Sequence, residues 1–456
     1  MSTNTNENTE LKRGLKNRHI QMIALGGAIG TGLFYGSATT IQQTGPSISL
    51  AYVIGGIIIF FIMRALGEMS VDTPVSGAFS YYAYKNWGEF PGFLSGWNYW
   101  FNYIVVSMAE LSVVGIYINF WLPAIPTWLS SLVFLIIVTL VNLISVKLYG
   151  EFEFWFALVK VVAIIALIVL GILMIFTGIG NGGQPTGFSN LWKNGGFFPH
   201  GITGLLFSLV MVMFSFGGVE LIGITAGEAD DPRKSIPKAI NQVVFRILIF
   251  YIGALGVMMT IFPWNKLGES GSPFVEIFSK IGIPAAAGIL NAVVLTAAVS
   301  AYNSGLYSNG RMLHSLALQG NAPKSLAKVS KSGTPIVGVL VSSALTLVAV
   351  ILNYFIPGKV FAYLISIATI AGIINWTMII ITQLKFRKLK SPEEVAKIHF
   401  KLPLYPISSY ICIAFMALVV VLMAIMPDYR IAVFIGPIWI LLLFVAFKLK
   451  KVQVKK

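Results

Sequence analysis

Apolar stretches of about 20 residues recur along almost the whole chain, separated by short segments with glycine, proline or charge. About 20 consecutive apolar residues are what an α-helix needs to cross the hydrocarbon core of a bilayer. Twelve stretches of this kind are expected, near 20–41, 47–71, 95–121, 127–147, 155–178, 202–226, 241–263, 284–310, 335–355, 359–384, 406–426 and 430–448. The pattern therefore predicts an all-α polytopic membrane protein with twelve transmembrane helices.

Lysine and arginine gather in the segments that would share one side of the membrane if the spans number twelve. Basic segments stay on the cytoplasmic side during insertion, so both termini are expected to be cytoplasmic. The expected divisions are a cytoplasmic tail 1–19, helices one to five in 20–178, an extracellular loop 179–201, helices six to ten in 202–384, a cytoplasmic loop 385–405, helices eleven and twelve in 406–448, and a cytoplasmic tail 449–456.

Composition agrees with this class of protein. Hydrophobic residues make up 56% of the 456 residues and charged residues only 11%, whereas soluble domains carry about 25% charged residues. The net charge of +15 comes from side chains at the ends of apolar spans, so we interpret it as an orientation signal and not as a nucleic-acid-binding surface. The single cysteine, Cys412, lies in an apolar span and is expected to pack there.

The first apolar span is interrupted by glycines. Its centre, 24–34, reads ALGGAIGTGLF and contains Gly26, Gly27, Gly30 and Gly32. Glycines this dense allow the backbone to unwind, and open backbone at membrane depth is tolerated only where it lines a cavity or is buried in protein. Such backbone can bind a small zwitterion through N–H and C=O groups. Helix-packing glycines are the other interpretation of this segment alone.

A second interruption favours the binding-site interpretation. Residues 214–220 read FSFGGVE, with Gly217 and Gly218 in the middle of the sixth apolar span. Two glycine-interrupted spans in corresponding positions of two halves are a strong pointer to a transporter binding site. The backbone is therefore expected to open at 28–32 and at 214–218, with the two openings facing each other near the middle of the membrane. The interruptions are five spans apart, which predicts an inverted repeat of helices one to five and six to ten, although no identity between the halves is visible in the sequence.

Ionisable residues inside a membrane are costly and are functional by default. Lys160 in the fifth span either reaches the interface with its long side chain or binds and releases a proton beside the first span. Glu220 directly follows the glycine pair, too deep to reach the interface, and is expected to be functional. Glu228 lies closer to the cytoplasmic end, where a gating pair and a plain interfacial position are both open. Arg311 ends the eighth span and is a candidate partner for Glu228 or Asp230 in a closed gate.

Polar residues also follow single helical faces. Tyr103, Ser107 and Glu110 share one face of the third span, which is expected to line the substrate path or to bond neighbouring helices. A stripe of polar residues in the eighth span, which packing between helices explains equally well, consists of Thr296, Ser300, Asn303 and Tyr307. Phe214 and Trp376 are candidates to cover a bound ligand, or packing aromatics.

Several phrases together resemble one family. ALGGAIGTGLF, FSFGGVELIGITAGEADDPRKSIPKA, NSGLYSNGRML and QGNAPK resemble bacterial amino acid permeases of the amino acid–polyamine–organocation superfamily, nearest to the proton-coupled permeases for proline, histidine, threonine or aromatic amino acids. The similarity runs through essentially the whole chain. It implies a leucine-transporter-type fold with a 5+5 inverted repeat and discontinuous helices one and six, placed in the bacterial cytoplasmic membrane.

The resemblance also implies roles for individual residues. The N–H groups of Gly30, Thr31 and Gly32 would bind the substrate carboxylate. The carbonyls of Ala28, Phe214 and Gly217 would bind its ammonium group, with Phe214 as an aromatic gate. Lys160 would replace a sodium ion and, when charged, contact Ser300, while Glu220 would be linked to proton coupling. Glu110 is not shared by all members of the family and is expected to mark a substrate choice.

These features favour secondary uptake of an amino acid, expected to be neutral, by proton symport with alternating access. An exchanger of the same fold, which needs no driving ion, is the alternative, and a channel or receptor is a more remote one. The chain contains no phosphate-binding loop of an ATP-driven pump. Its four histidines have no metal-binding spacing, so neither an enzyme nor a cofactor or metal site is expected.

Overall fold

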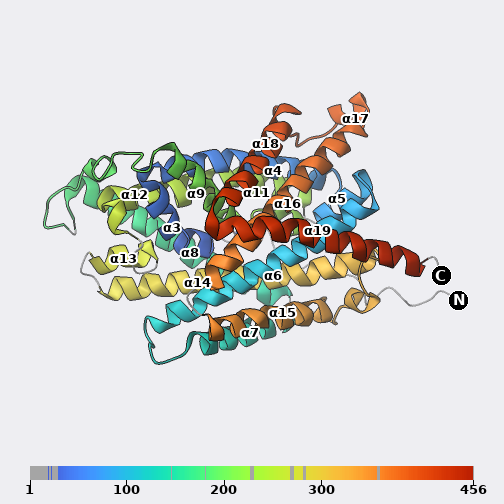
Figure 1. The fold of residues 1–456 in the computed structure, drawn as a ribbon, viewed down its shortest axis with the longest axis horizontal. Coiled ribbons are helices and arrows are strands. Elements are labelled where there is room, and N and C mark those ends of the chain that lie inside the picture. Colours follow the sequence, from blue (N-terminus) through green and yellow to red (C-terminus); the bar gives the residue numbers. More distant parts are fainter. Residues whose placement is uncertain are drawn as a thin grey trace.

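The computed structural model describes residues 19, 22, 29–75, 77–144, 146–179, 181–225, 231–267, 272–280, 284–356 and 360–454, and within these residues it contains helices and no β-strand (Figure 1). The α-helices are α2 (Thr31–Phe34), α3 (Ser37–Thr44), α4 (Ile48–Asp72), α5 (Ala78–Asn86), α6 (Glu89–Asn119), α7 (Thr127–Ile144), α8 (Val146–Thr177), α9 (Gly201–Ser215), α10 (Leu221–Thr225), α11 (Pro232–Arg246), α12 (Ala254–Ile261), α13 (Pro273–Lys280), α14 (Pro284–Leu318), α15 (Ile336–Phe355), α16 (Val360–Lys388), α17 (Pro392–Ala396), α18 (Ile407–Ile425) and α19 (Pro427–Val454). A π-helical stretch, Ile247–Gly253, joins α11 to α12.

Among the described residues, 10 helices are long and apolar enough to cross a membrane. The predicted fold class, an all-α polytopic membrane protein, is therefore confirmed. The two expected spans missing from the ten are 20–41 and 202–226, the two that carry the glycine interruptions. The first lies partly outside the described residues, and the second is divided, which leaves the shorter apolar helix Gly201–Ser215.

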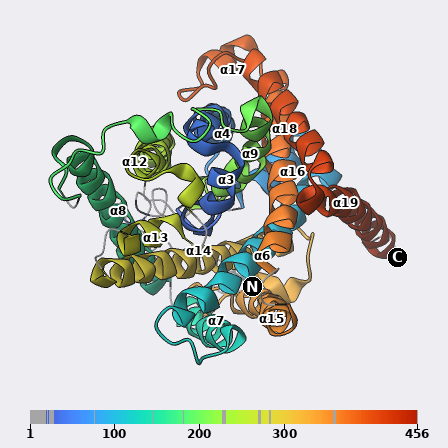
Figure 2. The ribbon, with the colours of Figure 1, turned by 60° about the vertical axis from the view of Figure 1, so that its left-hand side comes forward.

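Helices α6, α14 and α16 form the centre of the bundle. The most apolar part of each is 78% buried by protein, compared with 33% for α7 and α8 and 22% for α19. Helix α6 packs against both α14 and α16, while α7 and α15 pack against each other at one flank (Figures 1 and 2). The central helices therefore have few positions left for lipid, and their polar side chains face other helices.

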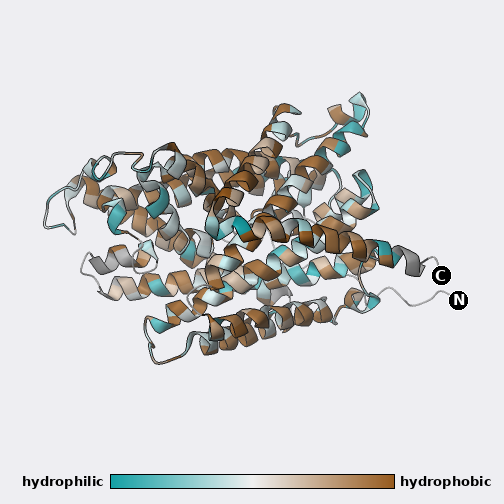
Figure 3. Ribbon diagram, viewed as in Figure 1, coloured by the Kyte–Doolittle hydropathy of each residue, from teal (hydrophilic) through white to brown (hydrophobic). Residues whose placement is uncertain are grey.

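The outer surface of the bundle is apolar between its two ends (Figure 3). Val162 and Trp155 of α8 are 57% and 59% exposed, and Leu441 and Phe434 of α19 are 61% and 64% exposed. Exposed apolar side chains at this density would be unfavourable in water, whereas lipid accommodates them. The loop 178–200 lies at one end of the bundle, and α5, α17 and the end of α19 lie at the other (Figure 1).

The first glycine-rich segment is non-helical where the structure describes it. Ile29 and Gly30 are outside any helix, Gly30 has an extended backbone (φ −115°, ψ −157°), and α2 begins at Thr31. Ala28, which begins the expected opening at 28–32, lies outside the described residues. The prediction that the opening extends through Gly32 is wrong, because Thr31 and Gly32 already belong to α2.

The second interruption lies two residues later than predicted. The expected opening was 214–218, but α9 continues to Ser215 and α10 begins at Leu221, which leaves 216–220 outside a helix. The reason is a tightened last turn of α9, in which the N–H of Gly217 donates to the carbonyl of Phe214 at 2.9 Å. Gly218 then adopts a φ of +97°, which favours glycine and directs the chain out of the helix.

A buried carboxylate attaches α4 to the connection between α16 and α18. Glu68 of α4 is fully buried and accepts hydrogen bonds from Nε and Nη2 of Arg387, the latter at 2.9 Å. The backbone N–H of Leu402 donates to the same carboxylate at 2.6 Å, and Gln383 Nε2 donates at 3.3 Å. A buried charge is sustained only by pairing of this kind. The pair therefore holds α16 against α4, and the Leu402 hydrogen bond holds the 389–406 connection there.

Replacing Arg387 by methionine is expected to lower the free energy of unfolding by about 3–5 kcal/mol, because Glu68 would remain buried without its cation. The measurement is the midpoint of thermal unfolding of the purified protein. The control is Lys390→Met, which removes the partly exposed pair with Asp72 (3.3 Å) and is expected to cost less than about 1 kcal/mol. Equal effects of the two substitutions would show that the buried pair has no special role.

Candidate functional site

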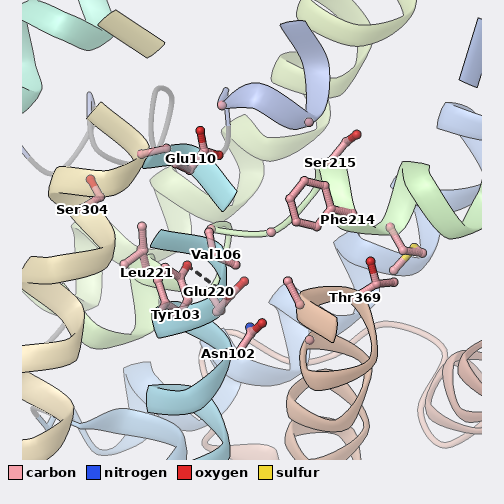
Figure 4. A pocket seen from close by; sticks show the side chains of 18 of the residues that line it. Asn102, Tyr103, Val106, Glu110, Phe214, Ser215, Glu220, Leu221, Ser304 and Thr369 are labelled. Atoms are coloured by element: carbon pink, nitrogen blue, oxygen red, sulfur yellow. Dashed lines mark hydrogen bonds between the residues drawn. The ribbon is translucent and has the colours of Figure 1, made fainter. Parts of the chain in front are cut away.

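A cavity lies between the two interruptions, in the middle of the bundle (Figure 4). About 630 Å³ of space free of protein atoms lies between its walls, counting the part that is open to solvent. Its walls come from α2, α6, α9, the 216–220 segment, α10, α14 and α16. The lining residues are Gly30, Gly32, Asn102, Tyr103, Val106, Glu110, Met213, Phe214, Ser215, Gly217, Gly218, Glu220, Leu221, Ala301, Ser304, Ala368, Thr369, Gly372 and Trp376.

At the start of α2 the backbone already binds a carboxylate of the protein itself. The N–H of Thr31 donates to both oxygens of Glu110 at 3.3 Å. A Cβ atom added to Gly30 would lie 2.7 Å from Glu110 Oε1, and one added to Gly32 would lie 2.8 Å from Ser215 Cα. Glycine is therefore required at both positions for this close approach, and Glu110 faces the cavity (Figure 4).

A second carboxylate lies in the unwound segment after α9. Glu220 is buried and accepts a hydrogen bond from Tyr103 Oη at 3.1 Å (Figure 4). It accepts another from Trp376 Nε1 at 3.3 Å. The donors come from α6 and α16, so the carboxylate is held between two central helices. Trp376 thus uses its indole N–H to orient Glu220 as well as its ring to line the cavity.

Lys160 does not line the cavity. It is fully buried on α8, and its Nζ donates to Ser300 Oγ on α14 at 2.9 Å. The interpretation that this lysine reaches the membrane interface is therefore wrong. Most of the polar stripe on α14 faces α7 and α8: Asn303 contacts Asn142 of α7 and Glu153 of α8, and Tyr307 stacks on Tyr149 of α8 with ring centroids 3.8 Å apart.

Sequence reasoning missed several residues of this region. Asn102, Ser304 and Thr369 line the cavity, and Glu153 bonds Ser300 beside Lys160. The role of Glu153 could have been predicted from its spacing in the sequence, because it precedes Lys160 by seven positions and therefore shares its helical face. The three cavity residues had none, since hydroxyl and amide side chains are common between packed membrane helices.

Of the expected gate pair, the structure describes Arg311 but not its acidic partner. Arg311 is buried, with its guanidinium carbon 3.2 Å from the centroid of the Tyr307 ring, and its Nη1 donates to the Tyr307 carbonyl at 3.3 Å. Glu228 and Asp230, its expected partners, lie outside the described residues, as does Ala28 at the start of the first opening. Arg311 therefore lies toward the C-terminal end of α14, stacked on the Tyr307 ring.

Comparison with known proteins agrees with the resemblance in the sequence. The family model described as "Amino acid permease" matches residues 19–456. The chain belongs to the amino acid permease family. An uncharacterized amino acid permease of Bacillus subtilis, YtnA, is 55% identical over 438 residues, which cover 96% of this chain and 95% of that protein. The aromatic amino acid transport protein AroP of Escherichia coli K12 is 53% identical over 446 residues, covering 98% and 97%.

Membership of this family decides the general activity. The match and the near-complete coverage of the relatives make the protein an amino acid transporter of the membrane, and not an enzyme. The cavity therefore has to be interpreted as part of a transport cycle. Its substrate and the driving ion are separate questions.

Proposed function

We propose that the protein imports a neutral amino acid with an apolar or aromatic side chain across the bacterial cytoplasmic membrane, by proton symport with alternating access. The observation that carries the proposal is the cavity between the two interruptions. It combines open backbone, two carboxylates and aromatic rings in the centre of a membrane bundle. The relatives named as aromatic amino acid transport proteins support the same substrate class.

In this proposal the backbone binds the amino acid part of the substrate. N–H groups of Gly30, Thr31 and Gly32 bind the carboxylate, so Glu110 has to release the Thr31 N–H when substrate arrives. The carbonyls of Ala28, Phe214 and Gly217 bind the ammonium group. The Phe214 carbonyl already accepts from the Gly217 N–H, and its second lone pair is the one available to the substrate. Gly218, with its positive φ, keeps this backbone open.

The side-chain part of the cavity favours a neutral substrate. Phe214, Val106, Leu221 and Trp376 supply apolar and aromatic surface. No lysine or arginine is among the lining residues of the described chain, whereas Glu110 and Glu220 both are. An acidic substrate side chain would meet like charge without a counter-ion, which costs binding free energy. In this proposal Phe214 and Trp376 also cover the bound ligand.

The architecture is proposed to be twelve helices with a 5+5 inverted repeat. Segments 20–178 and 202–384 form the repeats, 179–201 the outer loop and 406–448 the last two helices, with 385–405 and both tails (1–19 and 449–456) cytoplasmic. Support comes from the breaks before α2 and after α9, which the expected spans place five apart. The basic residues that accompany α17 and the end of α19 support a cytoplasmic location for that end.

Lys160 is proposed to couple transport to the proton. When charged, it donates to Ser300 and ties α8 to α14. When it loses its proton, the contact weakens and the inner side opens. A membrane potential assists inward movement of the charge, by about 2.3 kcal/mol per elementary charge and 100 mV. Glu220, Arg311 and Glu228 would take part in coupling or gating, and the substrate and proton are the only partners required besides the bilayer.

An uptake assay with purified protein in liposomes tests this function. An acidic exterior is expected to drive accumulation of labelled phenylalanine, about tenfold for each pH unit if one proton moves with each substrate. A protonophore should abolish the accumulation. In a competition screen with all common amino acids at two pH values, aromatic amino acids should compete best.

Two results would contradict parts of the proposal. Uptake that ignores the pH gradient but rises with amino acid trapped inside would identify an exchanger. Glutamate as the best competitor would overturn the neutral substrate class, because the cavity would then have to supply a cation that the described lining residues lack.

A further inference from the structure

A further buried acidic side chain lies in the bundle, outside the cavity. Glu153 of α8 is fully buried and is absent from the cavity lining. Its Oε1 accepts a hydrogen bond from Ser300 Oγ at 2.5 Å, and its Oε2 accepts one from Asn303 Nδ2 at 3.4 Å. Both donors are on α14. The carboxylate is therefore held against the same helix that Lys160 contacts.

The hydroxyl of Ser300 connects the acid to the lysine. Lys160 Nζ donates to Ser300 Oγ at 2.9 Å, and the same Oγ donates its hydrogen to Glu153 Oε1. Seven residues separate Glu153 from Lys160, about 10 Å along one face of α8. Because Ser300 lies between them, the three groups form a directed chain from ammonium to hydroxyl to carboxylate.

Electrostatics favour treating the acid and the lysine as one unit. A single buried charge costs several kcal/mol, and an opposite charge with good hydrogen bonds offsets that cost. Among the described residues, Glu110 of α6 and Arg246 of α11 also act on Lys160 by their charges, which have opposite signs. If Lys160 lost its proton to solvent by itself, Glu153 would remain as a buried anion without this cation. A transfer within the pair leaves no net buried charge.

We propose that Glu153 is the proton partner of Lys160, and that the two exchange a proton through the Ser300 hydroxyl. The inference rests on the proposed proton symport. The Nζ–H bond breaks as a new H–Oγ bond forms, while the original Oγ–H hydrogen passes to Oε1. The ion pair thereby becomes a neutral amine and a neutral carboxylic acid, and the serine is regenerated. Glu153 lies nearer the start of α8, which the proposed topology places at the cytoplasmic side, and it releases the proton there once the inner side has opened and water hydrates the carboxylate, so that no dry buried anion is formed.

The decisive variant is Glu153→Gln, which keeps the size and the acceptor oxygen but cannot carry the proton. Accumulation of phenylalanine driven by a pH gradient is expected to fall more than about tenfold, and the pH dependence of uptake to flatten. Proton entry accompanying substrate, measured with a pH dye inside the liposomes, should disappear. Exchange of external for internal substrate should persist, because the cavity is unchanged.

Two further variants make the result specific. Ser300→Ala removes the connecting hydroxyl with little change of shape and is expected to reproduce the loss of proton entry. The control is Glu151→Gln, an acid on the same helix whose Oε1 contacts His19 at 3.1 Å, and it should behave like the unmodified protein. If Glu153→Gln does not insert, Ser300→Ala decides the question alone.

Lys160→Ala separates failure of this inference from failure of the proposed function. If Lys160→Ala loses proton entry while Glu153→Gln and Ser300→Ala retain it, the relay is wrong and lysine coupling stands. If Lys160→Ala itself transports protons with substrate, the proposed role of Lys160 fails, and the relay fails with it. The relay is supported if proton entry is lost in all three variants and the Glu153→Gln/Lys160→Ala double variant loses no more than each single variant. Lys160, Ser300 and Glu153 would then act as one unit.

Discussion

Gly30→Val is expected to abolish uptake, with a loss of about 100-fold or more, while the protein still inserts into the membrane. A Cβ at this position would lie 2.7 Å from Glu110 Oε1 and 3.3 Å from the Cβ of Ala301. The two methyl groups of valine would extend further into the space proposed for the substrate carboxylate. Steric overlap of this kind costs about 1–3 kcal/mol in a packed interior, and here it is added to the loss of binding. Initial uptake of labelled phenylalanine is the measurement.

Gly256→Val is the matched control for this prediction. Gly256 is on α12, and a Cβ added there meets nothing within 4 Å, so uptake should stay close to that of the unmodified protein. Gly30→Ala should be intermediate, because the group it meets is the end of a flexible side chain. If Gly30→Val inserted normally and transported normally, the substrate carboxylate would have to bind somewhere other than the start of α2.

Glu110→Gln is expected to remove the pH dependence of substrate binding and to reduce accumulation by about tenfold. In the structure the Glu110 carboxylate occupies the Thr31 N–H that the substrate carboxylate is proposed to use. As the pH rises, a larger fraction of Glu110 is ionised, and the anion both competes for this N–H and repels the substrate. Binding to the unmodified protein should therefore weaken with rising pH. The glutamine amide carries no charge, so substrate binding to the variant should change little with pH.

The measurement is the equilibrium binding of phenylalanine at a low and a high pH, together with gradient-driven uptake. Glu89→Gln is a suitable comparison, since it changes an exposed acid at the start of the same helix, far from the cavity lining. Equal pH dependence in Glu110→Gln and the unmodified protein would mean that Glu110 does not compete with substrate. Glu220, the other carboxylate of the cavity, would then be the next candidate.

Gly30→Val and Glu110→Gln both test the close contact between the first interruption and α6, each through a different part of it. Gly30 allows the backbone of the first interruption to approach α6, and Glu110 uses that approach from the other side. Gly30→Val fills the space proposed for the substrate carboxylate. Glu110→Gln leaves that space open and removes only the negative charge beside it. If Gly30→Val and Glu110→Gln lost activity only because the protein misfolds, both variants would fail to insert into the membrane. The controls Gly256→Val and Glu89→Gln should insert normally.

The class of the protein and the approximate position of its cavity could be predicted from the amino-acid pattern alone. Ten of the expected spans correspond to long apolar helices, because lipid requires about 20 apolar residues in each and the pattern is local in the chain. The dense glycines likewise indicate open backbone wherever they occur. The whole-chain resemblance to amino acid permeases was confirmed by the family match over residues 19–456.

Which side chains meet could not be predicted in this way. Thr31 and Glu110 are 79 positions apart, Tyr103 and Glu220 are 117 apart, and Ser300 and Glu153 are 147 apart. Contacts of this kind depend on the rotation and depth of each helix in the bundle, which packing with several neighbours sets at once. Hydropathy contains no information about them, since a buried polar residue has the same signal whichever helix it faces.

The shift of the second interruption has the same origin. The glycine pair predicted an opening at 214–218, but the chain leaves the helix only after the last turn of α9 has closed on the Phe214 carbonyl. The carboxylate of Glu220 then lies inside the open segment, held by Tyr103 and Trp376 from two other helices. Sequence therefore determined that the sixth span would open near its glycines. Long-range hydrogen bonds and packing decided where the opening ends and which residue it presents to the cavity.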